Sequence, residues 1–262
     1  MTVTRSHGID IYYEMHGNLD AQRTIIFAHG MGGNAAIWFN QIVRFRKDYR
    51  IVTFDHRYFA RSKCAVDEFD PAKFPDDILA VMSQEKITSA IFVCQSMGGW
   101  TGSQLVLSHP SKVDALIMCH TPGIFFHPSA SYDSQDAARK VSTIGTDSSP
   151  ALAYDYPQKN PEGALLYQMI SAFNGIDNAV IPQKINEAKL GVNTDNLDAY
   201  DIPTLFITGN LDILFPAEFI RSLADTLNGA KCVNLGEVGH SSYFETPNAF
   251  NEVLAAFISN ND

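Results

Sequence analysis

Three loops of this chain carry side chains that could together perform nucleophilic catalysis. Ser96 follows an apolar run, Asp212 lies shortly before Pro216, and His240 follows Gly239 near the C-terminal end. A serine hydroxyl becomes a nucleophile when a histidine takes its proton, and a carboxylate holds that histidine in the required tautomer. Serine, aspartate and histidine in this order are therefore candidates for acyl transfer.

The surroundings of Ser96 favour a reactive position over a structural one. The apolar run ending at Val93 leads into residues 94–99, and a helical pattern follows. A serine on a sharp turn between strand and helix needs small residues on both sides, and Cys94 and Gly98 meet this need. Each glycine in a helix interior costs about 1 kcal/mol, so Gly98 and Gly102 indicate close backbone packing. The alternative is a serine that merely caps the helix.

Short apolar runs alternate with segments of helical periodicity along most of the chain. Continuous apolar runs are typical of strands covered on both faces, so the alternation predicts a parallel sheet wrapped by helices. An antiparallel strand is expected first, over residues 9–15. The predicted parallel strands are 25–28, 51–54, 90–93, 115–118, 204–207 and 232–235, and helical patterns run over 74–82, 220–227 and 250–258.

One long segment interrupts this rhythm. Residues 121–200 show no clear strand and are rich in glycine, proline, serine, asparagine and aspartate, yet they contain many aromatic side chains. The segment is too apolar for a linker. We therefore expect a small helical insertion packed over the sheet, with residues 1–120 and 201–262 forming the core.

Four motifs resemble those of the α/β-hydrolase superfamily. Residues 94–98 are similar to its nucleophile elbow, 29–33 to its HGxGG loop, 209–216 to GxxDxxxP and 239–247 to GHxxxxExP. The resemblance covers residues 23–120 and 202–258. It implies an α/β fold with a mostly parallel eight-stranded sheet flanked by helices, and a helical lid inserted after strand six.

The resemblance also implies a role for each site residue. Ser96 would be the nucleophile, His240 the base and Asp212 the acid, because the position after strand six holds no carboxylate. The backbone N–H groups of Met31 and Met97 would form the oxyanion hole, where losing one donor costs about 3–4 kcal/mol. Candidate substrate-binding residues are Gly30, Gly32, Phe125, His120 and Ser241.

Two departures from the family pattern concern glycines. Cys94 stands where the elbow usually has glycine, and Tyr58 and Ala60 replace both glycines of the family segment D-x-R-G-x-G-x-S. We interpret Asp55 and Arg57 of that segment as scaffold, and His29 as a support of the glycine-rich loop.

The expected reaction is hydrolysis of a small to medium-sized ester or lactone through an acyl-serine, without a metal or cofactor. Related serine enzymes include carbon–carbon hydrolases of ring-cleavage products and cofactor-free perhydrolases, and both remain alternatives. Ser241 stands where ring-cleavage hydrolases usually have tryptophan, and the insertion has a single arginine, Arg139. A neutral or lightly polar substrate is therefore favoured. A ligand-binding signalling protein that keeps the fold is the alternative from another class.

Composition narrows the setting. The 262 residues have a formal net charge of −10, which disfavours binding to nucleic acid or to anionic membrane surfaces. The chain starts without a signal-peptide pattern and has no apolar run long enough to span a membrane. Cys94, Cys119 and Cys232 sit in apolar runs that we interpret as strands, and they are expected to be buried, reduced thiols. These features predict a cytoplasmic protein.

Overall fold

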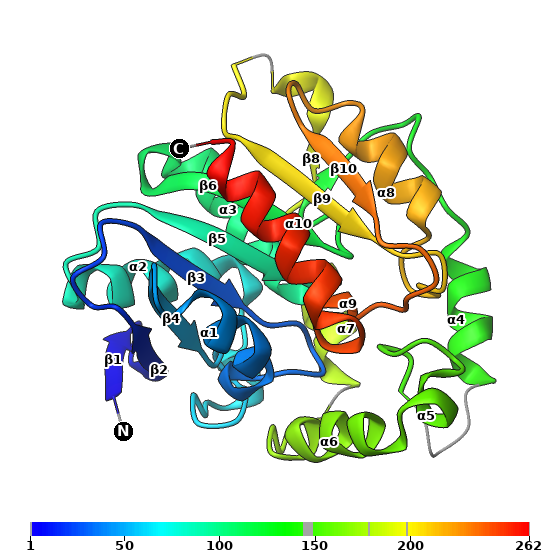
Figure 1. The fold of residues 1–262 in the computed structure, drawn as a ribbon, viewed down its shortest axis with the longest axis horizontal. Coiled ribbons are helices and arrows are strands. Elements are labelled where there is room, and N and C mark those ends of the chain that lie inside the picture. The colour runs from blue at the N-terminus through cyan, green and yellow to red at the C-terminus, as the bar shows by residue number, and fades with distance from the viewer. Residues whose placement is uncertain (1, 144–148, 178, 198, 262) are drawn as a thin grey trace.

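The computed structural model describes residues 2–143, 149–177, 179–197 and 199–261. Its centre is an eight-stranded sheet with the order β1-β2-β4-β3-β5-β6-β9-β10. The pairs β1/β2 and β2/β4 are antiparallel, and all other pairs are parallel, which confirms the expected mostly parallel sheet (Figure 1). The strands are β1 (Thr2–Ser6), β2 (Ile9–Gly17), β3 (Thr24–Ala28), β4 (Arg50–Phe54), β5 (Ala90–Gln95), β6 (Val113–Cys119), β9 (Thr204–Thr208) and β10 (Lys231–Asn234).

Helices cover both faces of this sheet. Apolar side chains of α2, α3 and α8 pack on one face, and those of α1, α9 and α10 pack on the other (Figure 1). The bounds are α1 (Phe39–Phe45), α2 (Phe74–Gln84), α3 (Gly99–Ser108), α8 (Ala217–Ala224), α9 (Ser242–Glu245) and α10 (Pro247–Ser259).

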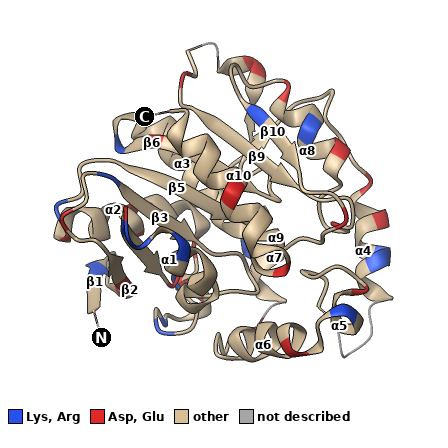
Figure 2. Cartoon of the chain, in the orientation of Figure 1, with Lys and Arg blue, Asp and Glu red and all other residues tan. Residues whose placement is uncertain are grey.

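The central strands are apolar along their whole length because both of their faces are covered. Successive side chains of a strand point to opposite faces. On β5, Phe92 joins the core beneath α2 and α3, whereas the neighbouring Val93 joins the core beneath α1 and α10. Figure 2 shows charged residues mainly on helices and loops, and β3, β5 and β9 carry none.

Two features at the edges of the sheet differ from expectation. β1 was not predicted from the sequence. Its polar side chains alternate in exposure, and the strand pairs with β2. Cys232 is only half-buried because β10 is an edge strand, whereas Cys94 and Cys119 are buried as expected.

The segment between β6 and β9 contains four helices within its described residues. They are α4 (Ser134–Ser142), α5 (Tyr156–Lys159), α6 (Pro161–Ala172) and α7 (Val180–Ala188). Two strands of two residues, β7 (Phe125–Phe126) and β8 (Val192–Asn193), pair in parallel near its ends, so the segment is not free of strands. Ile181 of α7 shares an apolar cluster with Met97, which ties the segment to the turn after β5.

Among the described residues, no helix combines the length and the apolar character that crossing a membrane requires.

Candidate active site

Ser96 occupies a strained turn between β5 and α3. β5 ends at Gln95, and Ser96 has a φ of +49°, in the left-handed region that non-glycine residues rarely adopt. Such strain costs of order 1–3 kcal/mol and is typical of functional positions. A Cβ on Gly98 would collide with the carbonyl oxygen of Ala28, so the turn packs directly against the end of β3. Glycine at this position is therefore required by a close backbone approach.

Cys94 fits into the elbow because a second glycine leaves room for its side chain. The Cys94 thiol is completely buried, and a Cβ on Gly102 of α3 would lie 2.7 Å from its sulfur. Burial raises the pKa of this thiol, so it stays protonated and acts as a small apolar side chain. The departure from the usual glycine is thus compensated within the same turn.

The glycine-rich loop after β3 lies against Ser96. A Cβ on Gly30 would lie 2.9 Å from the Cβ of Ser96 and would collide with the side chain of Gln95. The absence of a side chain therefore brings Met31, which follows Gly30, close to the serine. Met97 adjoins Ser96 within the elbow itself. The two residues predicted to supply oxyanion donors thus belong to segments that meet at Ser96.

His29 anchors the glycine-rich loop through hydrogen bonds made by both of its ring nitrogens. It is completely buried, its Nδ1 donates to the carbonyl oxygen of Gly30 (2.7 Å), and its Nε2 accepts from the backbone N–H of His56 (3.0 Å). Burial lowers the pKa of His29 to about 4, so the ring is neutral near pH 7. These contacts place His29 in a supporting position.

Asp212 lies in the loop after β9 and accepts four hydrogen bonds. Its Oδ1 accepts from the backbone N–H groups of Leu214 (2.9 Å) and Phe215 (3.0 Å). Its Oδ2 accepts from Nδ1 of His240 (2.9 Å) and from Nδ1 of His120 (3.0 Å). Burial alone would raise the pKa of Asp212, but the charge of His240 and the hydrogen bonds from both histidines lower it well below its usual range.

His240 lies in the loop between β10 and α9 with one ring nitrogen engaged. Because the Asp212 carboxylate can only accept, Nδ1 of His240 carries a proton. Nε2 makes no hydrogen bond to any described residue, Ser96 included. The histidine–aspartate pair is therefore assembled, whereas the serine–histidine contact is open.

Two side chains hold the His240 loop near Ser96. Gln95, which directly precedes the serine, donates from Nε2 to the backbone carbonyl of His240 (3.1 Å). Glu245 accepts from the backbone N–H groups of Gly239 (3.2 Å) and Ser241 (3.3 Å) on either side of the histidine. Sequence reasoning assigned neither role, although Gln95 stands next to the nucleophile and Glu245 belongs to the motif that located His240.

The remaining predicted substrate-binding residues lie in three different environments. Ser241 is completely buried, and its Oγ lies 3.4 Å from the hydroxyl of Tyr167 on α6. A Cβ on Gly32 would lie 2.6 Å from the same hydroxyl. His120 is bound to Asp212, and Phe125 is buried in the core, with its ring 6.1 Å from that of Tyr200. Neither His120 nor Phe125 lines the cavity described next, and their role in substrate binding stays a prediction.

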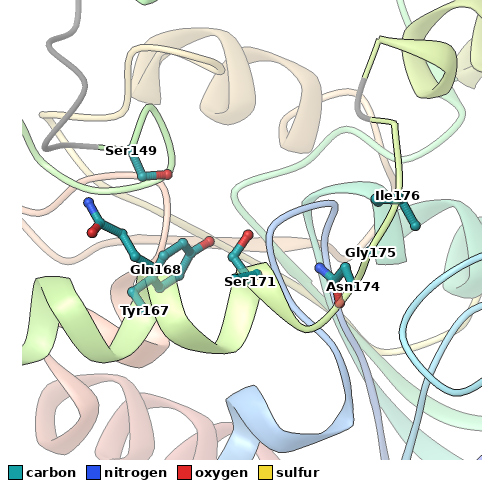
Figure 3. A pocket seen from close by; sticks show the side chains of 8 residues that line it. Ser149, Tyr167, Gln168, Ser171, Asn174, Gly175 and Ile176 are labelled. Atoms are coloured by element: carbon teal, nitrogen blue, oxygen red, sulfur yellow. The ribbon is translucent and has the colours of Figure 1, made fainter.

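A cavity of about 330 Å³ lies along α6 and the residues that follow it. Figure 3 shows Tyr167, Gln168 and Ser171 projecting from one face of α6 toward the segment that carries Ser149. Tyr167 also lies against Ser241 of the His240 loop and against Gly32 of the glycine-rich loop, so the cavity borders both loops. The described lining is free of charged side chains and consists of Ser149, Tyr167, Gln168, Ser171, Ala172, Asn174, Gly175 and Ile176.

One cluster of potential metal ligands lies within the described residues. Ligand atoms of His120, Asp212 and His240 are within 4.8 Å of one another, and all three residues are buried. Hydrogen bonds to Asp212 already occupy Nδ1 of both histidines, so a metal ion would have to replace two protons there. Asp212 and the two histidines are thus already joined to one another by hydrogen bonds.

A mostly parallel sheet with Ser96 after β5, Asp212 after β9 and His240 after β10 defines the α/β-hydrolase class. Comparison with known proteins agrees, because residues 23–247 match the family model for the alpha/beta hydrolase fold. The chain belongs to this family.

Individual relatives cover nearly the whole chain. "Putative carbamate hydrolase RutD" from Caulobacter sp. (strain K31) is 27% identical over 95% of this chain and 96% of its own length. A thermophilic esterase from Thermogutta terrifontis superimposes with a TM-score of 0.80 at 20% identity, covering 99% of this chain and 98% of the esterase. The enol-lactonase from Burkholderia xenovorans LB400 gives a TM-score of 0.78 at 22% identity, with coverages of 98% and 100%.

Proposed function

We propose that this protein is a serine hydrolase that cleaves a carboxylic ester or lactone of a small to medium-sized molecule. The observation that carries the proposal is the state of His240. Its Nδ1 donates to Asp212, its Nε2 makes no hydrogen bond to any described residue, and its backbone carbonyl accepts from Gln95, the residue before the strained Ser96. This arrangement leaves a ring nitrogen of His240 available in a loop held beside a serine on a strained turn, which is what a general base for Ser96 requires.

The proposed reaction has two halves. His240 Nε2 takes the proton of Ser96 as Oγ attacks the substrate carbonyl, and the backbone N–H groups of Met31 and Met97 stabilise the resulting oxyanion. The protonated His240 then gives its proton to the leaving alkoxide, which leaves an acyl group on Ser96. A water molecule, deprotonated by His240, attacks this acyl group, and Ser96 recovers its proton as the acid product departs.

The cavity along α6 supports an uncharged substrate. Its described lining includes polar side chains, such as that of Ser171, without a cationic side chain to pair with a carboxylate. A substrate that carries a free carboxylate would be desolvated there without a counter-charge, which is costly. Neutral or lightly polar esters and lactones fit this lining better.

The insertion is proposed to act as a lid over the site. Tyr167 of α6 lies against Gly32 and Ser241, and the backbone of Ala153 donates to Glu245 (3.2 Å) beside the His240 loop. Segments from residues 121–200 thus meet the glycine-rich loop and the His240 loop directly. A lid in this position would exclude water and shape the substrate pocket.

Hydrolysis of p-nitrophenyl acetate and butyrate by wild type, Ser96→Ala and Ser108→Ala tests the proposal. Ser108→Ala is a matched control because it removes an exposed serine hydroxyl from the end of α3, outside the site. We expect Ser96→Ala to lose about 10⁴-fold or more in kcat, as triad nucleophiles do, and Ser108→Ala to match wild type. Equal turnover by wild type and Ser96→Ala would show that the site assignment is wrong.

A carbamate is the second candidate substrate, and a curated relative favours it. The relative from Caulobacter sp. (strain K31), 27% identical over 95% of this chain, is named as a carbamate hydrolase. Carbamates have the same electrophilic carbonyl, so the steps at Ser96 would be unchanged. A p-nitrophenyl N-methylcarbamate assayed beside the esters separates the two, because a carbamate hydrolase would show the higher kcat/KM on it.

A ligand-binding protein that keeps the fold predicts a different result. Such a protein would release at most one equivalent of p-nitrophenol per chain and then stop. Continued release over many equivalents by wild type would exclude that alternative.

A further inference from the structure

His120 lies where the loops that carry the acid and the base meet. β6 ends at Cys119, and His120 follows it with a φ of +53° and a completely buried side chain. Its backbone N–H donates to the carbonyl oxygen of Ile207 on β9 (2.8 Å), which fixes the turn. A non-glycine residue keeps this conformation only where its surroundings enforce it. The strained turn directs the imidazole toward Asp212 and the N-terminal turn of α9.

Both ring nitrogens of His120 are engaged. Nδ1 lies 3.0 Å from Oδ2 of Asp212, and Nε2 lies 2.7 Å from Oγ of Ser242. Because an ionised carboxylate only accepts hydrogen bonds, Nδ1 of His120 carries the proton and Nε2 accepts from the Ser242 hydroxyl. His240 donates to the same Oδ2 atom from 2.9 Å. One carboxylate oxygen therefore serves two imidazoles.

We propose that His120 is a positioning residue that divides the Asp212 carboxylate between two imidazoles and thereby limits how strongly Asp212 stabilises the protonated form of His240. The inference rests on the proposed function, because it takes His240 as the base. Hydrogen bonds from a second donor draw negative charge on Oδ2 away from His240. The base accordingly stays unprotonated to a lower pH than it would beside an undivided carboxylate.

Few other titratable groups face this network. Asp212 comes from the loop after β9, and His240 from the loop before α9. Burial and the negative charge of Asp212 both raise the pKa of the Tyr132 phenol. The phenol therefore stays neutral. Glu245 of α9 is engaged by backbone N–H groups of the His240 loop. Replacing His120 therefore mainly changes the charge that Asp212 presents to His240.

Three variants separate this role from a structural one. His120→Asn keeps an N–H donor near the position of Nδ1, and His120→Leu removes it at similar size. Ser242→Ala removes the other partner of His120 and leaves its bond to Asp212 intact. Each variant is read by the pH dependence of kcat/KM on p-nitrophenyl acetate and by ¹⁵N NMR titration of the His240 ring, which needs no turnover.

For His120→Leu, we expect the acid limb of kcat/KM and the His240 NMR titration to move to higher pH by about one unit. The sign follows because an undivided carboxylate binds the protonated imidazole more strongly. His120→Asn and Ser242→Ala should titrate like wild type. An unshifted His120→Leu titration would overturn the proposal.

The tautomer of His120 in the wild type is a second test that needs no variant. ¹⁵N shifts should show a protonated Nδ1 and an unprotonated Nε2 on His120, and the reverse pattern would overturn the proposal. Failure of the proposed function would appear separately, as absent turnover or as activity that survives Ser96→Ala.

Discussion

The loops of the sheet and the insertion between β6 and β9 contribute to the site in different ways. The loops bury their polar groups and satisfy them, as Asp212 shows with four hydrogen bonds. In the insertion, α4 has no buried residue, α6 exposes Leu165 and Met169, and Phe173 directly after α6 is exposed as well. The predicted catalytic groups thus lie in loops of the sheet, which together with the sheet and its helices form the frame of the molecule, whereas the insertion exposes apolar side chains and contacts that frame from several of its segments.

Two contacts of the insertion reach different loops of the frame. Tyr167 reaches Ser241 in the His240 loop, and Asn174 accepts from the side chain of Asn34 (3.0 Å) beyond the glycine-rich loop. Both contacts come from α6 or the residue pair that follows it. The difference between the two regions therefore predicts that the stability lost by a substitution on α6, or on the residues that follow it, depends on whether the side chain is buried or exposed.

Tyr167→Ala against Phe173→Ala tests this division with the largest expected effect. Tyr167 is buried and packs edge-on against Phe244, with ring centroids 5.1 Å apart, whereas Phe173 is 76% exposed. Removing a buried aromatic ring costs about 3–5 kcal/mol, and an exposed one changes stability by about 0.5 kcal/mol or less. Urea denaturation measures both, and similar losses in the two variants would contradict the comparison.

The second prediction concerns the frame: its buried histidines make the stability of the protein depend on pH. The folded pKa of His29 is about 4, against an ordinary value of 6.5, because burial disfavours its charged form. Between these values the unfolded chain binds a proton that the folded chain does not. Stability is therefore lost as the pH falls from 6.5 toward 4, by about 3 kcal/mol for this residue. His56 and His120 act in the same direction.

Urea denaturation at pH 7, 5 and 4 measures this loss. His29→Asn removes the titrating ring, so its stability should fall less steeply than that of the wild type over this interval. His109→Asn, at an exposed histidine, is the matched control and should keep the wild-type slope. A pH-independent wild type would show that these histidines are not held neutral.

The smallest expected effect concerns a position where the frame meets the insertion. Ala60 has a φ of +42° and donates its backbone N–H to the carbonyl oxygen of Asn174 (3.2 Å). Ala60→Gly relieves the left-handed strain and keeps that hydrogen bond, so we expect stability to rise by about 0.5 kcal/mol. Ala36→Gly, in the short 3-10 helix Ala35–Trp38, should instead lower stability. A destabilised Ala60→Gly would contradict this reading of the strain.

Local patterns predicted most of the frame. The predicted parallel strands lie within two residues of the observed ones at every end, because buried strands leave a continuous apolar signature. The motifs also placed Asp212 and His240 in loops that the structure brings together. Tyr58 and Ala60, which replace two family glycines, keep positive φ values of +79° and +42°, so the backbone of that segment is preserved without glycine.

Contacts between distant segments could not be predicted in this way. The hydrogen bond between His120 and Asp212 joins residues 92 positions apart. Neither periodicity nor a motif in the sequence predicts it. The half-buried state of Cys232 depends on β10 being at the sheet edge, which only the strand order reveals. Phe125 is hydrophobic in either setting, so its type alone cannot separate a pocket wall from a core residue.

Glu245 connects the insertion and the His240 loop through one carboxylate. Its Oε2 accepts from Ala153 in the insertion (3.2 Å) and from Gly239 beside His240 (3.2 Å), and a Cβ on Gly239 would collide with the backbone of Ala153. In thermodynamic terms, the two segments share a coupling free energy. A ligand that displaces Ala153 weakens the anchoring of the His240 loop, and a change in that loop alters ligand affinity at the insertion by the same factor. Ligand binding at the insertion and the position of the His240 loop are thus linked equilibria.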